Sequence, residues 1–318
     1  MRHMSSSLTS PRSLGIAIGI VACNTTIQPN NVVTDASTPD GSDASADPLV
    51  LQNTCESWMA AQRATDIRKL VPASNEKMRS DMLTAGGGVR KLGDTYYAMW
   101  FPKSWYSATV RRVMFTLHGT HGAPEFEWND WKDHFTRRTW GFVGLNYLID
   151  ETAGDAGYLE PDAIYKHLKE ILDEMKVPCA VDSAAISMMG WSRGSIQGLR
   201  TLIVDHADRK LLLGHLANSA AWGSNDDALP AELVTIRASG NTNALAGLNY
   251  WMYCGEQDTD ENGVSKCAGM AHAQEFLSSY GAHIETLYRN PGPGADHHSL
   301  PVTQDAVDKA LTYFESLR

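Results

Sequence analysis

One segment near the middle of the chain restricts the fold more than any other feature of the sequence. A short apolar run, Ala184–Met189, leads directly into Gly190-Trp191-Ser192-Arg193-Gly194, and a helical pattern follows from about Ser195 to His206. A buried strand that turns straight into a helix is typical of a parallel α/β sheet. The two glycines suit a sharp turn in which any side chain would collide. We therefore expect Ser192 at the tip of a strand-to-helix turn.

The chain from residue 51 onward supports the same architecture. Apolar runs alternate with helical patterns, which predicts α/β units rather than an all-β or all-α fold. The expected strands are Tyr96–Phe101, Arg112–Leu117, Phe142–Leu148, Leu211–Leu216, Tyr250–Cys254 and Ile284–Tyr288, and the expected helices are Pro161–Met175 and residues 302–317. We predict one domain over residues 51–318, with a doubly wound, mostly parallel sheet and helices on both faces. Residues 51–90 match no pattern that we recognise.

The N-terminal region predicts export. The apolar run from Leu14 to Ala22 is far shorter than the ~20 residues needed to cross a bilayer, so we expect a signal peptide over residues 1–22. Its end, Ile20-Val21-Ala22-Cys23, resembles a bacterial lipobox, which makes Cys23 the candidate lipid-bearing residue and the only expected attachment to a membrane. A plain cleaved signal and a buried N-terminal helix are the alternatives. The protein is then a cell-envelope lipoprotein or is secreted.

Polar composition predicts a flexible linker over residues 23–50. This stretch is rich in Asn, Thr, Asp, Ser and Pro and contains no Lys or Arg, so it cannot bury enough apolar surface to offset its ordering entropy. The whole chain has a formal net charge of −10 and no basic stripe, which argues against nucleic acid as a partner.

Four cysteines remain after Cys23, and an even number in an exported protein favours disulfides. We expect the close pair Cys254–Cys267, which leaves Cys55 with Cys179; free buried thiols are the alternative. The cysteines lack a C-x-x-C spacing, and no metal site is predicted.

Two later segments supply the groups that a nucleophilic serine needs, namely a base and an acid that orients it. Asp258 comes shortly after the predicted strand Tyr250–Cys254, with Glu256 and Asp260 as competing acids. Residues 258–263 also begin like a calcium-binding loop, but the position that needs a bidentate Glu is Gly269. Two histidines, His297 and His298, follow the last strand, so acid and base occur in the expected order.

Backbone N–H donors would complete such a site by binding the negatively charged oxygen of a tetrahedral intermediate. Arg193 follows the serine directly and is one candidate donor. The loop His118-Gly119-Thr120-His121-Gly122 follows the strand Arg112–Leu117, and Thr120 is the second candidate. The histidines of this loop lack a third zinc ligand, so we expect them to be structural.

Four segments together resemble the α/β-hydrolase superfamily: Leu117-His118-Gly119, Gly190–Gly194, Gly255–Thr259 and Asp296–Ser299. Within it, roughly residues 90–318 are most similar to secreted esterases of the polyhydroxybutyrate depolymerase and feruloyl esterase group. The resemblance implies an α/β-hydrolase fold and ester hydrolysis by a Ser-His-Asp triad without a cofactor. Arg193 and Ser195 depart from the residues usual in that group, which leaves the substrate, a small molecule or a polymer, open.

The choice between the two histidines also depends on this resemblance. Consecutive side chains in an extended loop point in opposite directions, so only one of them can face Ser192. The resembling esterases often place a small residue after the catalytic histidine, and Ser299 follows His298. The G-x-x-H spacing from Gly294 favours His297 instead. We select His298 as the base, with His297 as the alternative.

Aromatic residues near the predicted strand ends are candidate substrate contacts. Trp191 and Trp222 flank strand ends, and Trp128 and Trp131 lie in the segment expected to form a loop after the strand Arg112–Leu117. Packing in the core is the competing explanation for each of them. A serine exopeptidase would use the same triad, and a scaffold that had lost its activity would be a binding lipoprotein.

Overall fold

The computed structural model describes residues 47–62, 75–181, 185–220, 222, 229–259 and 263–317. The predicted signal peptide, Cys23 and most of the predicted linker lie outside these ranges. Helix α1 begins at Pro48, so the folded domain starts slightly before the expected boundary at residue 51. None of the helices within these ranges is both long enough and apolar enough to cross a membrane.

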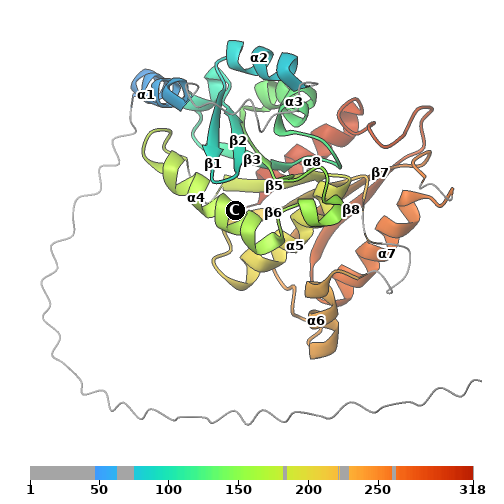
Figure 1. Ribbon diagram of the computed structural model, residues 1–318. Helices are drawn as coiled ribbons and strands as arrows, with labels where there is room; N and C mark the ends of the chain where they lie inside the picture. Colours follow the sequence, from blue (N-terminus) through green and yellow to red (C-terminus); the bar gives the residue numbers. More distant parts are fainter. Residues whose placement is uncertain are drawn as a thin grey trace, which may run out of the picture. The chain divides into compact units, whose positions relative to one another are not determined.

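An eight-stranded sheet with the order β1-β2-β4-β3-β5-β6-β7-β8 forms the centre of the domain (Figure 1). The strands are β1 (Gly88–Leu92), β2 (Thr95–Trp100), β3 (Arg112–Leu117), β4 (Trp140–Asn146), β5 (Ile186–Trp191), β6 (Leu212–Asn218), β7 (Asn249–Gly255) and β8 (His283–Asn290). β1 and β2 pair in antiparallel fashion, as do β2 and β4, while every neighbouring pair from β4 across to β8 is parallel. The predicted mostly parallel sheet is confirmed.

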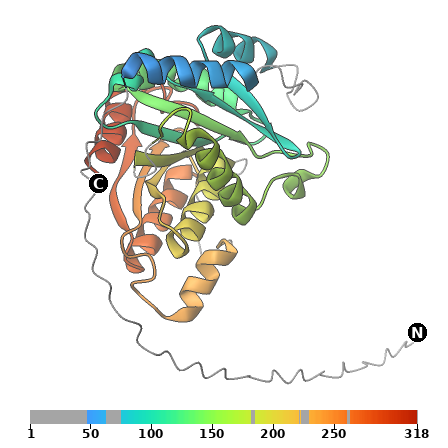
Figure 2. The ribbon, with the colours of Figure 1, turned by 90° about the vertical axis from the view of Figure 1, so that its left-hand side faces the viewer.

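Helices cover both faces of this sheet. One face packs against α1 (Pro48–Gln62), α4 (Pro161–Lys176), α5 (Arg193–Ala207), α6 (Ala231–Ser239) and α7 (Lys266–Ser279). The other face packs against α2 (Glu76–Thr84), α3 (Pro124–Arg138) and α8 (Gln304–Ser316). In Figure 2 the face that carries α1, α4 and α5 is turned toward the viewer.

The period-two geometry of a strand explains why two cores form. In β2, Tyr97 and Met99 belong to the core on the α4 side, whereas Tyr96 and Ala98 belong to the core on the α3 side. Because helices cover both faces, every residue of β2 is buried, as is typical of strands inside a two-sided sheet.

Helix α3 corrects one expectation from the sequence. The segment after β3 was expected to be a loop, but residues Pro124–Arg138 form a helix. Trp128 and Trp131 are 2% and 1% exposed and belong to the core, so neither is available to a substrate. The helix begins with Pro124 and has acidic residues in its first turn, which is a favourable N-terminal sequence for a helix. The expectation of a loop overlooked this signal.

Both expected disulfides are present, and they connect different parts of the domain. Cys254–Cys267 joins the end of β7 to the start of α7 across 13 residues of sequence. Cys55–Cys179 joins α1 to the segment after α4, with a sequence separation of 124. The segment after α4 leads into the amino end of β5, so this second bridge lies at the edge of the sheet opposite Ser192.

The two bridges should therefore differ in their effects on stability and on turnover. Replacing both Cys254 and Cys267 by serine should cost about 3 kcal/mol of unfolding free energy. Replacing both Cys55 and Cys179, which close a longer loop, should cost roughly 5 kcal/mol. Only the first pair should lower kcat, because its loop carries Asp258. Denaturant unfolding and ester kinetics on both double variants check this. Equal kcat values in the two variants would contradict the prediction.

His215 gives the fold a sensitivity to acid. Its ring is fully buried in β6: a Cβ on Gly198 would lie 2.2 Å from Nε2, and the Tyr250 ring centroid is 5.1 Å away. Neither ring nitrogen has a hydrogen-bond partner among the described residues. Burial lowers the pKa of His215 to about 3, because a charged imidazolium would lose its hydration.

We therefore expect His215 to destabilise the protein as the pH falls. Below about pH 6.5 the unfolded chain binds a proton on this histidine and the folded chain does not, so stability is lost progressively toward the folded-state pKa. At pH 4.5 this amounts to about 3 kcal/mol. In His215→Leu the loss of unfolding free energy between pH 7 and pH 4.5 should shrink by that amount. An unchanged pH dependence in His215→Leu would refute the prediction.

Candidate active site

Ser192 occupies a strained turn between β5 and α5. Its backbone angles are φ 53° and ψ −120°, a conformation that costs a non-glycine residue about 1–3 kcal/mol. A Cβ on Gly190 would lie 2.0 Å from the carbonyl oxygen of Gly194, and a Cβ on Gly194 would lie 2.1 Å from that of Leu117. Only glycine fits at either position, as the sequence predicts. The turn is held in place by the Ser192 N–H, which donates to the carbonyl of Asn218 at 2.8 Å.

Ser195 supports this turn from within the protein. Its hydroxyl oxygen is fully buried, 2.6 Å from the carbonyl oxygen of Gly190 and 2.8 Å from that of Asn218. The same oxygen accepts the N–H of Asn218 at 2.9 Å. Ser195 therefore links the end of β5 to the end of β6, which gives a structural reason for a serine at this position.

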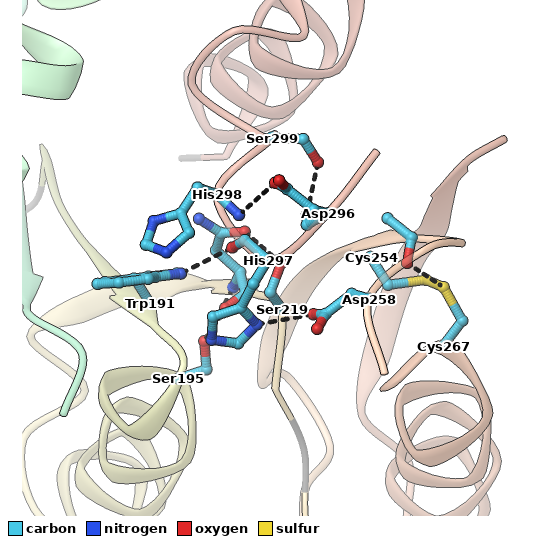
Figure 3. Close-up of polar contacts among 12 residues, drawn as sticks. Trp191, Ser195, Ser219, Cys254, Asp258, Cys267, Asp296, His297, His298 and Ser299 are labelled. Carbon is cyan, nitrogen blue, oxygen red and sulfur yellow. Dashed lines mark hydrogen bonds and ion pairs between the residues drawn. A yellow bond between two sulfur atoms is a disulfide. The ribbon is translucent and has the colours of Figure 1, made fainter. Parts of the chain in front are cut away.

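Asp258 and His297 form a hydrogen-bonded pair beside this turn (Figure 3). Asp258 Oδ2 lies 2.7 Å from Nδ1 of His297, and because a carboxylate only accepts, Nδ1 carries the proton. The Asp258 residue is 5% exposed, and its carbonyl accepts the N–H of Lys266 at 2.9 Å. Of the competing acids, Glu256 is exposed and Asp260 lies outside the described residues. The side chain of Asp258, the first residue of the calcium-loop alternative, is hydrogen-bonded to His297, so that alternative gains no support.

The structure corrects the choice between the two histidines. His298 is exposed and its ring packs at 4.4 Å from the Trp191 ring, while its main-chain N–H donates to Asp296 Oδ1 at 2.9 Å. The planes of the two imidazoles differ by 86°, and it is His297 whose Nδ1 lies 2.7 Å from Asp258. The expectation that His298 pairs with Asp258 is wrong, and His297 takes that place.

The loop after β3 forms a tight turn that orients a peptide group. The carbonyl of Gly119 accepts the N–H of Gly122 at 3.0 Å and is 2.8 Å from Nδ1 of His118. In a planar trans peptide the next N–H points the opposite way, so the Thr120 N–H is directed away from both of these groups. His118 is fully buried, and burial lowers its pKa to about 4, so that the ring is neutral at neutral pH.

Arg193 has separate roles for its backbone and its side chain. It is the first residue of α5, so its N–H has no partner within the helix. Its guanidinium carbon lies 4.4 Å from the centroid of the Tyr158 ring and its side chain is paired with Asp155 of η3 (Gly154–Gly157). The Tyr158 hydroxyl accepts the N–H of His121 at 3.0 Å, so these contacts join the helix start to the turn after β3.

No protein-family model and no curated protein matches the sequence. Solved structures do. An esterase from Rhizomucor miehei has a TM-score of 0.56 at 14% identity, with 83% of this chain and 96% of that chain covered. The carboxylesterase EstE1 from a metagenomic library has a TM-score of 0.52 at 16% identity, covering 86% and 98%. An S-formylglutathione hydrolase from Agrobacterium tumefaciens has a TM-score of 0.52 at 13% identity, covering 73% and 95%.

The chain has the α/β-hydrolase fold. The predicted fold class is thereby confirmed, while the narrower resemblance to the polyhydroxybutyrate depolymerase and feruloyl esterase group stays a prediction. In this fold, Ser192, Asp258 and His297 follow β5, β7 and β8, at the carboxyl ends of parallel strands where such sheets bind ligands.

Trp222 does not have the surroundings expected of a substrate contact. It is 4% exposed, and its ring lies 5.7 Å from that of Phe276 and 6.3 Å from that of His272, both on α7. We conclude that Trp222 packs in the core.

Sequence reasoning missed a buried acid on α3, the helix that follows the turn at Thr120. Glu127 is 5% exposed, and burial together with the charge of Asp130 raises its pKa well above the usual range of a carboxyl group. Glu127 lies in the first turn of α3, where acidic residues usually serve the helix dipole, so the sequence gave no sign of its burial.

Proposed function

We propose that this protein is a serine hydrolase that cleaves carboxylic esters through an acyl-enzyme intermediate. The observation that carries the proposal is the strained turn at Ser192 together with the Asp258–His297 hydrogen bond, all at the same edge of the sheet. A turn of this kind exposes a serine hydroxyl above the sheet, and the acid–imidazole pair is the arrangement that activates it.

In the first half of the reaction, Ser192 Oγ attacks the ester carbonyl carbon and its proton passes to Nε2 of His297. Asp258 stabilises the resulting imidazolium and keeps Nε2 free to accept, because it holds the proton on Nδ1. The carbonyl oxygen becomes an oxyanion, which the N–H groups of Thr120 and Arg193 bind. When the C–O bond breaks, the proton on Nε2 goes to the leaving alcohol.

In the second half, a water molecule attacks the acyl-enzyme and gives its proton to His297. The second tetrahedral intermediate collapses, the carboxylic acid leaves, and the proton returns to Ser192 Oγ. Each step uses groups of the chain itself and water.

Two further observations support the substrate class and the compartment. Two of the three similar structures named above are esterases by name, which favours esters over peptides as substrates. The two disulfides are typical of proteins outside the reducing cytosol, which supports export. We extend the proposal to a signal peptide over residues 1–22, a lipid anchor at Cys23 and a linker over residues 23–50.

A substrate panel tests the proposed function and narrows it. The purified protein and Ser192→Ala would be assayed on nitrophenyl esters of graded chain length, on feruloyl and polyester substrates, and on aminoacyl nitroanilides. Ester hydrolysis that is lost in the variant is expected. Hydrolysis of nitroanilides alone would indicate the exopeptidase, and no turnover of any substrate would indicate a binding protein.

A further inference from the structure

Trp191 directly precedes Ser192, and its side chain reaches the loop that carries the histidines. The indole Nε1–H donates to the main-chain carbonyl of His297 at 2.8 Å, 106 residues further along the chain (Figure 3). The Trp191 ring centroid is 4.4 Å from that of His298 and 5.4 Å from that of His297. A single side chain therefore connects the turn at Ser192 to the histidine loop.

The same indole fills the space beside the turn after β3. A Cβ on Gly119 would lie 2.5 Å from Cε3 and 2.7 Å from Cζ3 of Trp191, closer than real Cβ atoms approach. Gly119 is not among the glycines with positive φ, so its backbone conformation does not require glycine. Position 119 needs glycine because the Trp191 ring occupies the place of a side chain. The indole thus contacts the turn that presents the Thr120 N–H as well as the histidine loop.

We propose that Trp191 is a positioning residue that holds His297 in place relative to Ser192 and to the Thr120 turn. This inference rests on the proposed function. The direction in which Nε2 of His297 points depends on two anchors: Trp191 holds the carbonyl of the residue, and Asp258 holds Nδ1 of its ring at 2.7 Å. With one anchor lost, the ring can swing about the other.

The surroundings of His297 make the main-chain anchor necessary. The His297 side chain is 27% exposed, so packing alone does not fix it. A displacement of about 1 Å at a catalytic group can cost on the order of 10²-fold in rate. We therefore assign Trp191 to alignment of the base rather than to the substrate contact expected from the sequence.

The test compares Trp191→Phe with Trp100→Phe. Trp100, on β2, makes the same kind of bond outside the site: its Nε1–H donates at 3.0 Å to the carbonyl of Ala85, the residue that follows α2. Phenylalanine keeps an aromatic ring and removes the N–H in both variants. The readouts are kcat, KM, and the low-field proton resonance of His297 Nδ1–H, which is assigned by its loss in His297→Gln.

We expect Trp191→Phe to lower kcat by roughly 10- to 100-fold with KM changed less than about threefold. The low-field resonance should exchange with water at least about tenfold faster, because the ring is held at one end only. Trp100→Phe should leave kcat, KM and the resonance unchanged. Gly119→Ala is a second variant that keeps the N–H but displaces the ring, and it should reproduce the loss of kcat if Trp191→Phe does not fold.

Wild-type kcat together with a wild-type resonance in Trp191→Phe would overturn the proposal. An increase in KM without a change in kcat would also overturn it and would make Trp191 a substrate contact. The resonance does not depend on turnover, so it decides the role of Trp191 even if the wild-type protein hydrolyses no ester, a result that would overturn the proposed function alone.

Discussion

Replacing Ser192 by alanine should lower ester turnover by up to about 10⁶-fold and leave the fold intact. The hydroxyl is the proposed nucleophile, and no other group in the site would replace it. Alanine and serine both carry a Cβ, so the strained conformation at φ 53° costs the variant no more than the wild type. The measurements are kcat on a nitrophenyl ester and the free energy of unfolding in denaturant.

Ser195→Ala is the matched control for this experiment. It removes a buried hydroxyl three residues away, which bonds to two strand ends, and it should cost about 1–3 kcal/mol of unfolding free energy. Because the nucleophile remains, turnover should stay within about tenfold of the wild type. Turnover in Ser192→Ala within tenfold of the wild type would remove Ser192 from the mechanism.

The second large effect concerns the two histidines. His297→Ala should lower kcat by about 10⁴-fold or more, because it removes the group that takes and returns the proton. His298→Ala should cost about tenfold or less, since His298 lies on the Trp191 ring and does not contact Asp258. Steady-state kinetics of both variants decide the question, and the reverse ranking would restore His298 as the base.

Asp258→Asn adds a test of whether acid and base act together. Alone it should lower kcat by about 10⁴-fold, because an amide can hold the wrong imidazole tautomer. In the His297→Ala background it should have almost no further effect, since residues that act as one unit are strongly non-additive. Additive losses would show that Asp258 acts independently of His297.

The features of the site that depend on local backbone geometry could be predicted from the sequence. The turn at Ser192 is determined within five residues, because positions 190 and 194 both require glycine. A side chain at 190 would collide with the backbone of Gly194, and one at 194 would collide with the backbone of Leu117. Asp258 was also predictable, since it follows a recognisable buried strand at the edge where parallel α/β sheets collect functional groups.

The features that depend on distant contacts could not be predicted. The pairing of His297, rather than His298, with Asp258 depends on hydrogen bonds to Trp191 and Asp258, whereas the spacings within the histidine loop gave conflicting indications. For Trp222 the sequence left substrate contact and core packing open, because α7, which packs against its ring, does not stand out in the sequence. The role of Trp191 likewise depends on the approach of Gly119 from another strand end.

The central claim, that Ser192 is an activated nucleophile, is tested most directly by covalent labelling. The purified protein would be incubated with a fluorophosphonate probe, digested and analysed by mass spectrometry. The account predicts one label per chain, located on Ser192, with labelling abolished in Ser192→Ala and strongly slowed in His297→Ala. A label on another residue, or no label on the folded wild-type protein, would contradict it.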